Sequence, residues 1–127
     1  MQPLILCVHM DQAYLMRLSF TALSLGIHVK EVREDQWGQS LAALCGLTPM
    51  ASNPPRVKVT EIMLIFAHFP NGLLDQFLSE MRKNHLAPIR LKAVLTPHNQ
   101  NWNCGQLCAM LSQEVAEIEK AQKRKSI

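Results

Sequence analysis

The sequence predicts an α/β domain with a small four-stranded, mainly parallel sheet in the strand order 2-1-3-4. Two short, wholly apolar runs each precede a stretch with hydrophobic residues at helical spacing, and a second strand-like run follows each helix. The chain has 127 residues, of which 48% are hydrophobic and 18% charged; this composition supports one core and excludes an intrinsically disordered chain. We therefore expect a single domain built from two strand–helix–strand–helix halves.

The first half covers residues 1–46. Residues 4–8 form an apolar run, which is typical of a strand covered on both faces. Asp11 is a candidate helix N-cap, and Gly26 suits the left-handed conformation that ends a helix. Residues 27–32 begin with strict alternation and predict a half-exposed strand. Glu34 then opens a short helix that Gly46 closes.

Residues 47–59 are rich in Pro, Ser and Asn and predict a surface linker. The second half, residues 60–119, repeats the plan with an apolar strand at 61–67, a helix capped by Asn71 and a strand at 89–95. Asn103 is the candidate cap of the last helix. We expect its inner face to carry Leu107, Leu111, Val115 and Ile118. Residues 120–127 form a basic tail.

The strand order follows from the hydrophobic patterns. The first and third strands are apolar throughout and are expected at the centre of the sheet, whereas the second and fourth alternate and are expected at its edges. Strand–helix–strand units need parallel strands with right-handed crossovers. The pair Val8-His9 also matches Ala67-His68, which suggests an internal repeat.

In such a sheet, ligands bind at the carboxyl ends of the strands, where the strand order reverses. We expect His9 and Asp11 to face His68 and Asn71 there. A polar loop with a tryptophan follows the fourth strand, and its amides suit a small polar ligand, although turns and caps explain the same residues equally well. The predicted ligand-binding residues are His9, Asp11, Trp37, His68, Asn71, Thr96, His98, Asn99 and Trp102.

Two further clusters have a functional and a structural interpretation. His9, His68 and His98 at one edge, with Asp11 nearby, would suit an open zinc or iron site; polar residues that simply end strands are the favoured interpretation, so no metal or cofactor is predicted. Cys104 and Cys108 lie one helical turn apart. We favour buried thiols over a redox pair, with Cys104 as the more reactive residue.

A family resemblance appears at the fourth strand. Residues 91–97, with Asn99 and Trp102 after them, resemble the signature of a bacterial family, domain of unknown function 3783. Residues from about 61 to 120 are similar to that family, and the segments Leu25-Gly26-Ile27 and Trp37-Gly38-Gln39 are similar to the half that often precedes the domain. His98 stands where a small polar residue is expected. The resemblance implies no activity, because the family has no assigned function.

No catalytic template is present: the sequence contains neither GxxxxGK[ST], GxGxxG nor GxSxG. The net charge of +3 belongs to the tail, since residues 120–127 hold four of the 13 basic residues and none of the 10 acidic ones. We therefore expect nucleic acid as a partner only through the tail. We expect a cytoplasmic, non-catalytic binding or interaction module without a membrane partner. A small metal- or ligand-dependent enzyme at the same edge is the alternative, and a homodimer stays open.

Overall fold

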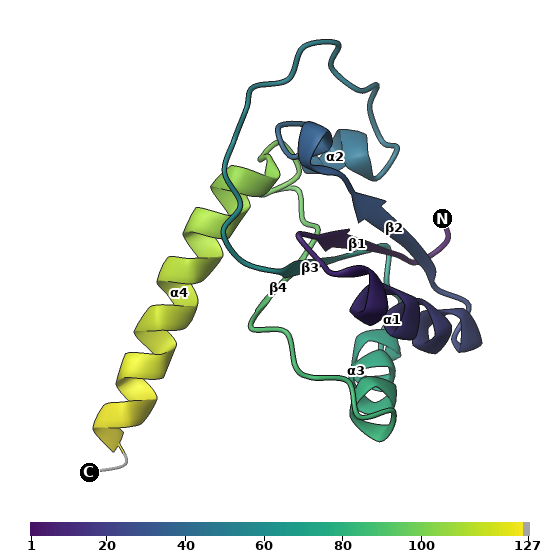
Figure 1. Ribbon diagram of the computed structural model, residues 1–127, viewed down its shortest axis with the longest axis vertical. Helices are drawn as coiled ribbons and strands as arrows, with labels where there is room; N and C mark the ends of the chain where they lie inside the picture. Colours follow the sequence, from purple (N-terminus) through teal and green to yellow (C-terminus); the bar gives the residue numbers. More distant parts are fainter. Residues whose placement is uncertain (126–127) are drawn as a thin grey trace.

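The computed structural model describes residues 1–125 and contains one sheet with helices on both of its faces (Figure 1). The elements in chain order are β1 (Leu4–Val8), α1 (Gln12–Ser24), β2 (His28–Val32), the 3-10 helix η1 (Glu34–Gln36), α2 (Leu41–Leu44), β3 (Met63–Ala67), α3 (Leu73–Lys83), β4 (Leu91–Val94) and α4 (Cys104–Lys125). Each half thus has the predicted order of elements, except that the short helix after β2 is split into η1 and α2.

The strand order β2-β1-β3-β4 confirms the prediction, but the strand directions do not. β1 runs parallel to β2, and β3 runs parallel to β4, whereas β1 and β3 are antiparallel, with Leu6 opposite Ile65 and Val8 opposite Met63. The sheet is therefore mixed, and the prediction of a mainly parallel sheet is wrong. A strand buried on both faces has the same apolar pattern in either direction. Residues 45–62 contain no helix or strand and bring the chain to the Val8 end of β1.

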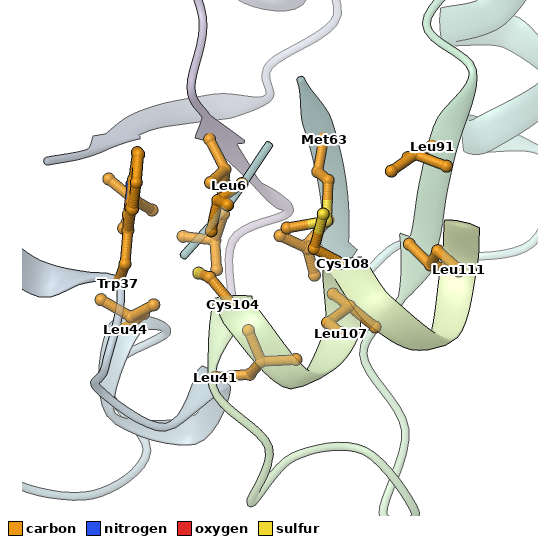
Figure 2. Close-up of a cluster of buried hydrophobic side chains, with 14 of the residues drawn as sticks. Leu6, Trp37, Leu41, Leu44, Met63, Leu91, Cys104, Leu107, Cys108 and Leu111 are labelled. Carbon is orange, nitrogen blue, oxygen red and sulfur yellow. The ribbon is translucent and has the colours of Figure 1, made fainter. Parts of the chain in front are cut away.

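The two faces of the sheet are covered by different helices. Alternate residues of the central strands, such as Ile5 and Phe66, pack against α1 and α3. The residues between them, such as Leu6 and Ile65, pack against α2 and α4. Figure 2 shows the second cluster, in which Trp37, Leu41 and Leu44 of the first half meet Cys104, Leu107 and Cys108 of the second. This arrangement confirms that residues 4–8 form a strand covered on both faces.

Helix ends explain several of the predicted boundaries. The Asp11 carboxylate accepts a hydrogen bond from the Tyr14 N–H at 2.8 Å and caps α1. Gly26 follows α1 with φ of 72°, a left-handed conformation that suits glycine. Asn103 caps α4 through a reciprocal pair, because its Oδ1 accepts from Gln106 N–H and its own N–H donates to Gln106 Oε1, both at 2.9 Å.

Two predicted helix features are wrong. Asn71 does not cap α3, because the N-cap is Gly72, which has φ of 86° and makes no side-chain capping bond. Ile118 does not face inward; its side chain is 57% exposed, whereas Leu107 is buried. α4 continues to Lys125 and projects beyond the sheet in Figure 1, so its last turns have no core to cover. Residues 120–125 of the predicted tail are helical, and residues 126–127 lie outside the described residues.

The linker is largely exposed, as predicted, but it is held at three points. Gln39 is buried and exchanges two hydrogen bonds of 2.8 Å with the backbone of Ala51. A Cβ added to Gly38 would lie 1.9 Å from Pro55 O, and one added to Gly105 would lie 2.7 Å from Val57 Cβ. The absence of side chains at these two glycines therefore lets the linker lie directly on both halves.

The two halves also complete each other's helices. Leu41 N–H and Ala42 N–H, at the start of α2, donate to Trp102 O and Gln100 O at 2.8 Å. Cys104 N–H, at the start of α4, donates to Trp37 O at 3.0 Å. The first N–H groups of a helix have no acceptor within that helix. Here each helix finds its acceptors in the loop that precedes the other.

Candidate functional site

Because β1 and β3 are antiparallel, the predicted site residues are divided between the two opposite ends of the strands, which we call the first and second edges. His9 and Asp11 follow β1 at the edge where β3 begins, whereas His68 and Asn71 follow β3 at the edge where β1 begins. Because β4 runs parallel to β3, Thr96 lies at the His68 edge. The expectation that His9, His68 and His98 emerge at one edge is therefore wrong. No group of three or more His, Cys, Asp or Glu side chains within residues 1–125 is arranged to hold a metal ion.

The first edge carries a hollow of about 430 Å³, which we call the β1–β2 hollow. Its lining brings together three of the predicted residues with five neighbours: His9, Met10, Asp11, Glu31, Val32, Arg33, Glu34 and Trp37. The His9 and Trp37 rings meet edge to face with centroids 5.5 Å apart and an interplanar angle of 77°. Both residues were predicted to bind ligand at the carboxyl ends of the strands, and the fold packs them together.

Two residues of this hollow are in energetically unfavourable local states. His9 has φ of 59°, which a residue with a side chain rarely adopts. Trp37 is 8% exposed, and its Nε1–H has no hydrogen-bond partner within the described residues. The backbone of Trp37 is nevertheless fixed, because its carbonyl oxygen accepts the hydrogen bond from Cys104.

The hollow is acidic. Asp11, Glu31 and Glu34 outnumber Arg33, whose guanidinium already pairs with Asp35 at 3.2 Å. Glu31 accepts a hydrogen bond from the Gln12 side chain at 2.8 Å, which holds its carboxylate beside the start of α1. The same carboxylate affects the core below it. Burial raises the pKa of the Cys7 thiol to about 12, with a smaller contribution from the negative charge of Glu31.

A second hollow of about 470 Å³ adjoins the first and shares Glu34 with it. Its other lining residues are Asp35, Pro54, Pro55, Arg56 and Val57. Sequence reasoning placed residues 54–57 in a surface linker and did not connect them with the site. The signal that would have found them is Gly38, since a glycine just after η1 permits the close approach of the Pro55 backbone.

At the second edge, the predicted residues do not form a comparable hollow in the described part of the chain. His68 has φ of 62°, and its Nε2 is buried without a hydrogen-bond partner among the described residues. Asn99 is 8% exposed and serves its own turn: its Oδ1 accepts from Thr96 N–H at 2.9 Å, and its Nδ2 donates to Val94 O at 3.0 Å. This geometry favours the structural interpretation of Asn99.

His98 and Trp102 form a second edge-to-face pair, with ring centroids 5.3 Å apart and an interplanar angle of 69°. The His98 side chain is exposed and Trp102 is half-buried against the core beneath α4. Because Trp102 O accepts the hydrogen bond from Leu41, this loop also positions α2.

The cysteines are free thiols in the described structure, and three of them are buried. Cys104 is completely buried, and burial raises its pKa to about 12, with a further contribution from Cys108. The prediction that Cys104 is the more reactive thiol is therefore wrong: the helix N-terminus is covered by the first half of the chain. Cys45 is the one that is half-exposed.

The family comparison concerns the second half of the chain. Residues 62–118 match the model of the domain of unknown function DUF3783. The match confirms the resemblance of the second half to this family. The matched segment contains β3, α3, β4 and most of α4, including His68 and the loop from Thr96 to Trp102. His9, Asp11 and Trp37 lie outside the DUF3783 segment, so the β1–β2 hollow is built by the half that precedes it.

No curated protein and no solved structure matches the chain. Among the described helices, none combines the length and the apolar character that crossing a membrane requires.

Proposed function

We propose that the chain is a non-catalytic binding module and that its ligand occupies the β1–β2 hollow. The observation that carries the proposal is the packing of His9 against Trp37 in the wall of a hollow of about 430 Å³. Both residues are held in costly local states, and such states concentrate at binding sites when the surrounding structure maintains them.

The charge of the hollow indicates the class of ligand. Three carboxylates and one paired guanidinium favour a cationic group, such as the amine or guanidinium of a small molecule or of a basic peptide side chain. The aromatic rings of Trp37 and His9 beside the carboxylates support the same choice, because the face of an indole attracts cations.

The test is a titration of the full chain with a tetra-arginine peptide, in which binding is monitored through the amide and indole NMR signals. We expect shifts at His9, Glu31 and the Trp37 indole N–H, and none with a tetra-glutamate peptide. Glu31→Gln and Glu34→Gln should each weaken binding about two- to fivefold, as expected for exposed charge pairs. Equal binding of the two peptides would contradict the proposal.

His9→Gly and His85→Gly form a matched pair for this experiment. Both histidines have a left-handed backbone, with φ of 59° and 57°, but His85 follows α3 and does not line the hollow. Glycine keeps that backbone and removes the ring. We expect loss of peptide binding in His9→Gly and unchanged binding in His85→Gly; the same affinity in both would show that the His9 ring has no part in binding.

We also propose that the chain is one folding unit that works in the cytoplasm. The antiparallel pairing of β1 with β3 supports one unit, because the two halves share the centre of one sheet. Four free cysteines in the described structure support a reducing compartment.

A further inference from the structure

A third hollow lies on the opposite half of the molecule, between the end of α3 and β4. It measures about 250 Å³, and we call it the α3–β4 hollow. Its lining residues are Leu78, Met81, Arg82, Leu86, Pro88, Ile89 and Lys92. Met81, Leu86 and Ile89 are 5%, 6% and 7% exposed, so the apolar wall is made of fixed core residues.

The rim of this hollow is cationic. Arg82 and Lys92 are its charged lining residues, and no carboxylate lines it. Lys92 is held in place, because its Nζ donates a hydrogen bond to Ile89 O at 2.5 Å. Lys83, the next cation on α3, pairs with Glu80 at 3.3 Å, whereas Arg82 makes no ion pair within residues 1–125. Two positive charges thus stand beside apolar side chains without a neutralising partner.

The position of β4 in the sheet keeps this hollow open. β4 is an edge strand, with β3 as its single neighbour. Side chains two residues apart on a strand share a face, so Val94 lies on the same face as Lys92, and it is 46% exposed. The apolar surface therefore continues along the strand from the cationic rim.

We propose that the α3–β4 hollow binds a short amphiphilic carboxylate, with its hydrocarbon chain against Met81, Leu86 and Ile89 and its carboxylate beside Arg82 and Lys92. Apolar walls account for the chain, and two unneutralised cations account for the acid group. The volume lies below the range of about 300–1,000 Å³ that drug-sized ligands occupy, so a medium-chain acid fits better than a long one. This site is independent of the β1–β2 hollow.

The experiment titrates the full chain with octanoate and with two matched probes, octan-1-ol and acetate. Octanol has the chain without the charge, and acetate has the charge without the chain. We expect octanoate to shift the amide signals of Leu78, Ile89 and Lys92, and to bind at least tenfold more tightly than either probe. Equal affinity for octanoate and octanol, shifts confined to other elements, or no octanoate binding at millimolar concentration would overturn the proposal.

Variants separate the rim from the wall. Arg82→Gln and Lys92→Gln should each weaken octanoate binding about two- to fivefold and leave octanol binding unchanged. Lys83→Gln is the matched control, because it removes a cation from the same helix that does not line the hollow. Leu78→Gln should weaken both ligands. The proposal fails if Lys83→Gln weakens binding as much as Arg82→Gln does.

Discussion

Gln39 and Ala51 exchange two hydrogen bonds of 2.8 Å, so a buried side-chain amide takes the place of a strand partner for the linker. The linker therefore has a fixed path although it contains no helix or strand. This path matters for the candidate site, because residues 54–57 line the hollow that shares Glu34 with the β1–β2 hollow.

Gln39→Ala should detach the linker at this point. We expect a loss of about 1–2 kcal/mol in the free energy of unfolding, since two hydrogen bonds are removed and the Ala51 groups can turn to water. Urea denaturation measures the loss, and limited proteolysis should show new cleavage within residues 47–56. Gln76→Ala, at an exposed position of α3, is the control and should change neither.

Gly38→Ala should be more damaging than Gly105→Ala. The new methyl group at residue 38 meets the Pro55 carbonyl oxygen at 1.9 Å, and a backbone atom cannot rotate away. At residue 105 the nearest atom is Val57 Cβ at 2.7 Å, so the overlap is smaller. We expect about 2–3 kcal/mol of destabilisation for Gly38→Ala and about 1 kcal/mol for Gly105→Ala, measured by urea denaturation. The reverse ranking would contradict this account of the linker.

His85→Gly should stabilise the chain. His85 follows α3 with φ of 57°, and Leu86 N–H donates to Met81 O at 3.0 Å, as in a helix that ends with a left-handed residue. Glycine relieves the left-handed strain and gives back part of the gain as chain entropy. We expect a gain of about 0.5–1 kcal/mol by thermal or urea denaturation. A loss of stability would show that the imidazole itself supports the end of α3.

Thiol labelling should distinguish Cys45 from the other three cysteines. Cys7, Cys104 and Cys108 are buried, so a thiol reagent reaches them only when the fold opens. We expect one thiol to react quickly in the native chain and four in urea. Cys45→Ser should remove the fast reaction, and a persistent fast reaction in that variant would contradict the burial of the others.

The buried thiols also predict a dependence of stability on alkaline pH. Burial raises the pKa of Cys7 and Cys104 from 9.0 in the absence of such burial to about 12. The stability that their protonated forms contribute is complete below the unfolded pKa and is lost as the pH rises towards 12. We expect the melting temperature to fall above about pH 9, and to fall less steeply in Cys104→Val. Parallel curves for the two proteins would refute the role of this thiol.

Arg90 should hold the middle of α4 against the sheet. Its guanidinium pairs with Glu61 at 2.9 Å and with Glu119 at 3.1 Å. Arg90→Met should therefore speed amide exchange in residues 115–119 while leaving residues 107–111 unchanged, because the latter are held by the core. Equal exchange in the variant and the natural chain would show that the ion pairs are dispensable.

The same contact predicts an acid dependence. The hydrogen bond from Arg90 lowers the pKa of Glu119, so the folded chain binds this proton at a lower pH than the unfolded chain does. The ion pair's contribution to stability is present above the usual glutamate pKa of about 4.3 and is lost as the pH falls through the lowered pKa. The difference in exchange between Arg90→Met and the natural chain should then disappear; a difference that persists in acid would contradict this assignment.

The order of the strands could be predicted because burial leaves a direct pattern in the sequence. Residues 4–8 and 63–67 are apolar throughout and lie at the centre, and the cap at Asp11 depends on local hydrogen bonds. The direction of the third strand could not be predicted, because neither its apolar run nor the preceding linker specifies the end at which the chain enters the strand. Because β1 and β3 are antiparallel, His9 and His68 lie at opposite ends of the strands.

The candidate site was predictable only in part. His9, Asp11 and Trp37 lie within one hollow, since their strands are parallel neighbours and direction within a strand–helix–strand unit is fixed. The linker residues of the adjoining hollow depend on the approach of Pro55 to Gly38, a contact between segments with no periodic pattern. Burial of Cys104 depends likewise on Trp37 and Leu44 from the other half.

Leu41 N–H of the first half donates to Trp102 O, and Cys104 N–H of the second half donates to Trp37 O. Each half therefore supplies hydrogen-bond acceptors for the first turn of a helix in the other half. A protease cut in the linker would leave two fragments, each with the helix amides that the other satisfies and with one strand of the central pair. We expect such fragments to recombine. The continuity of the chain between its halves therefore raises their local concentration, while the specificity of their association lies in the fold itself.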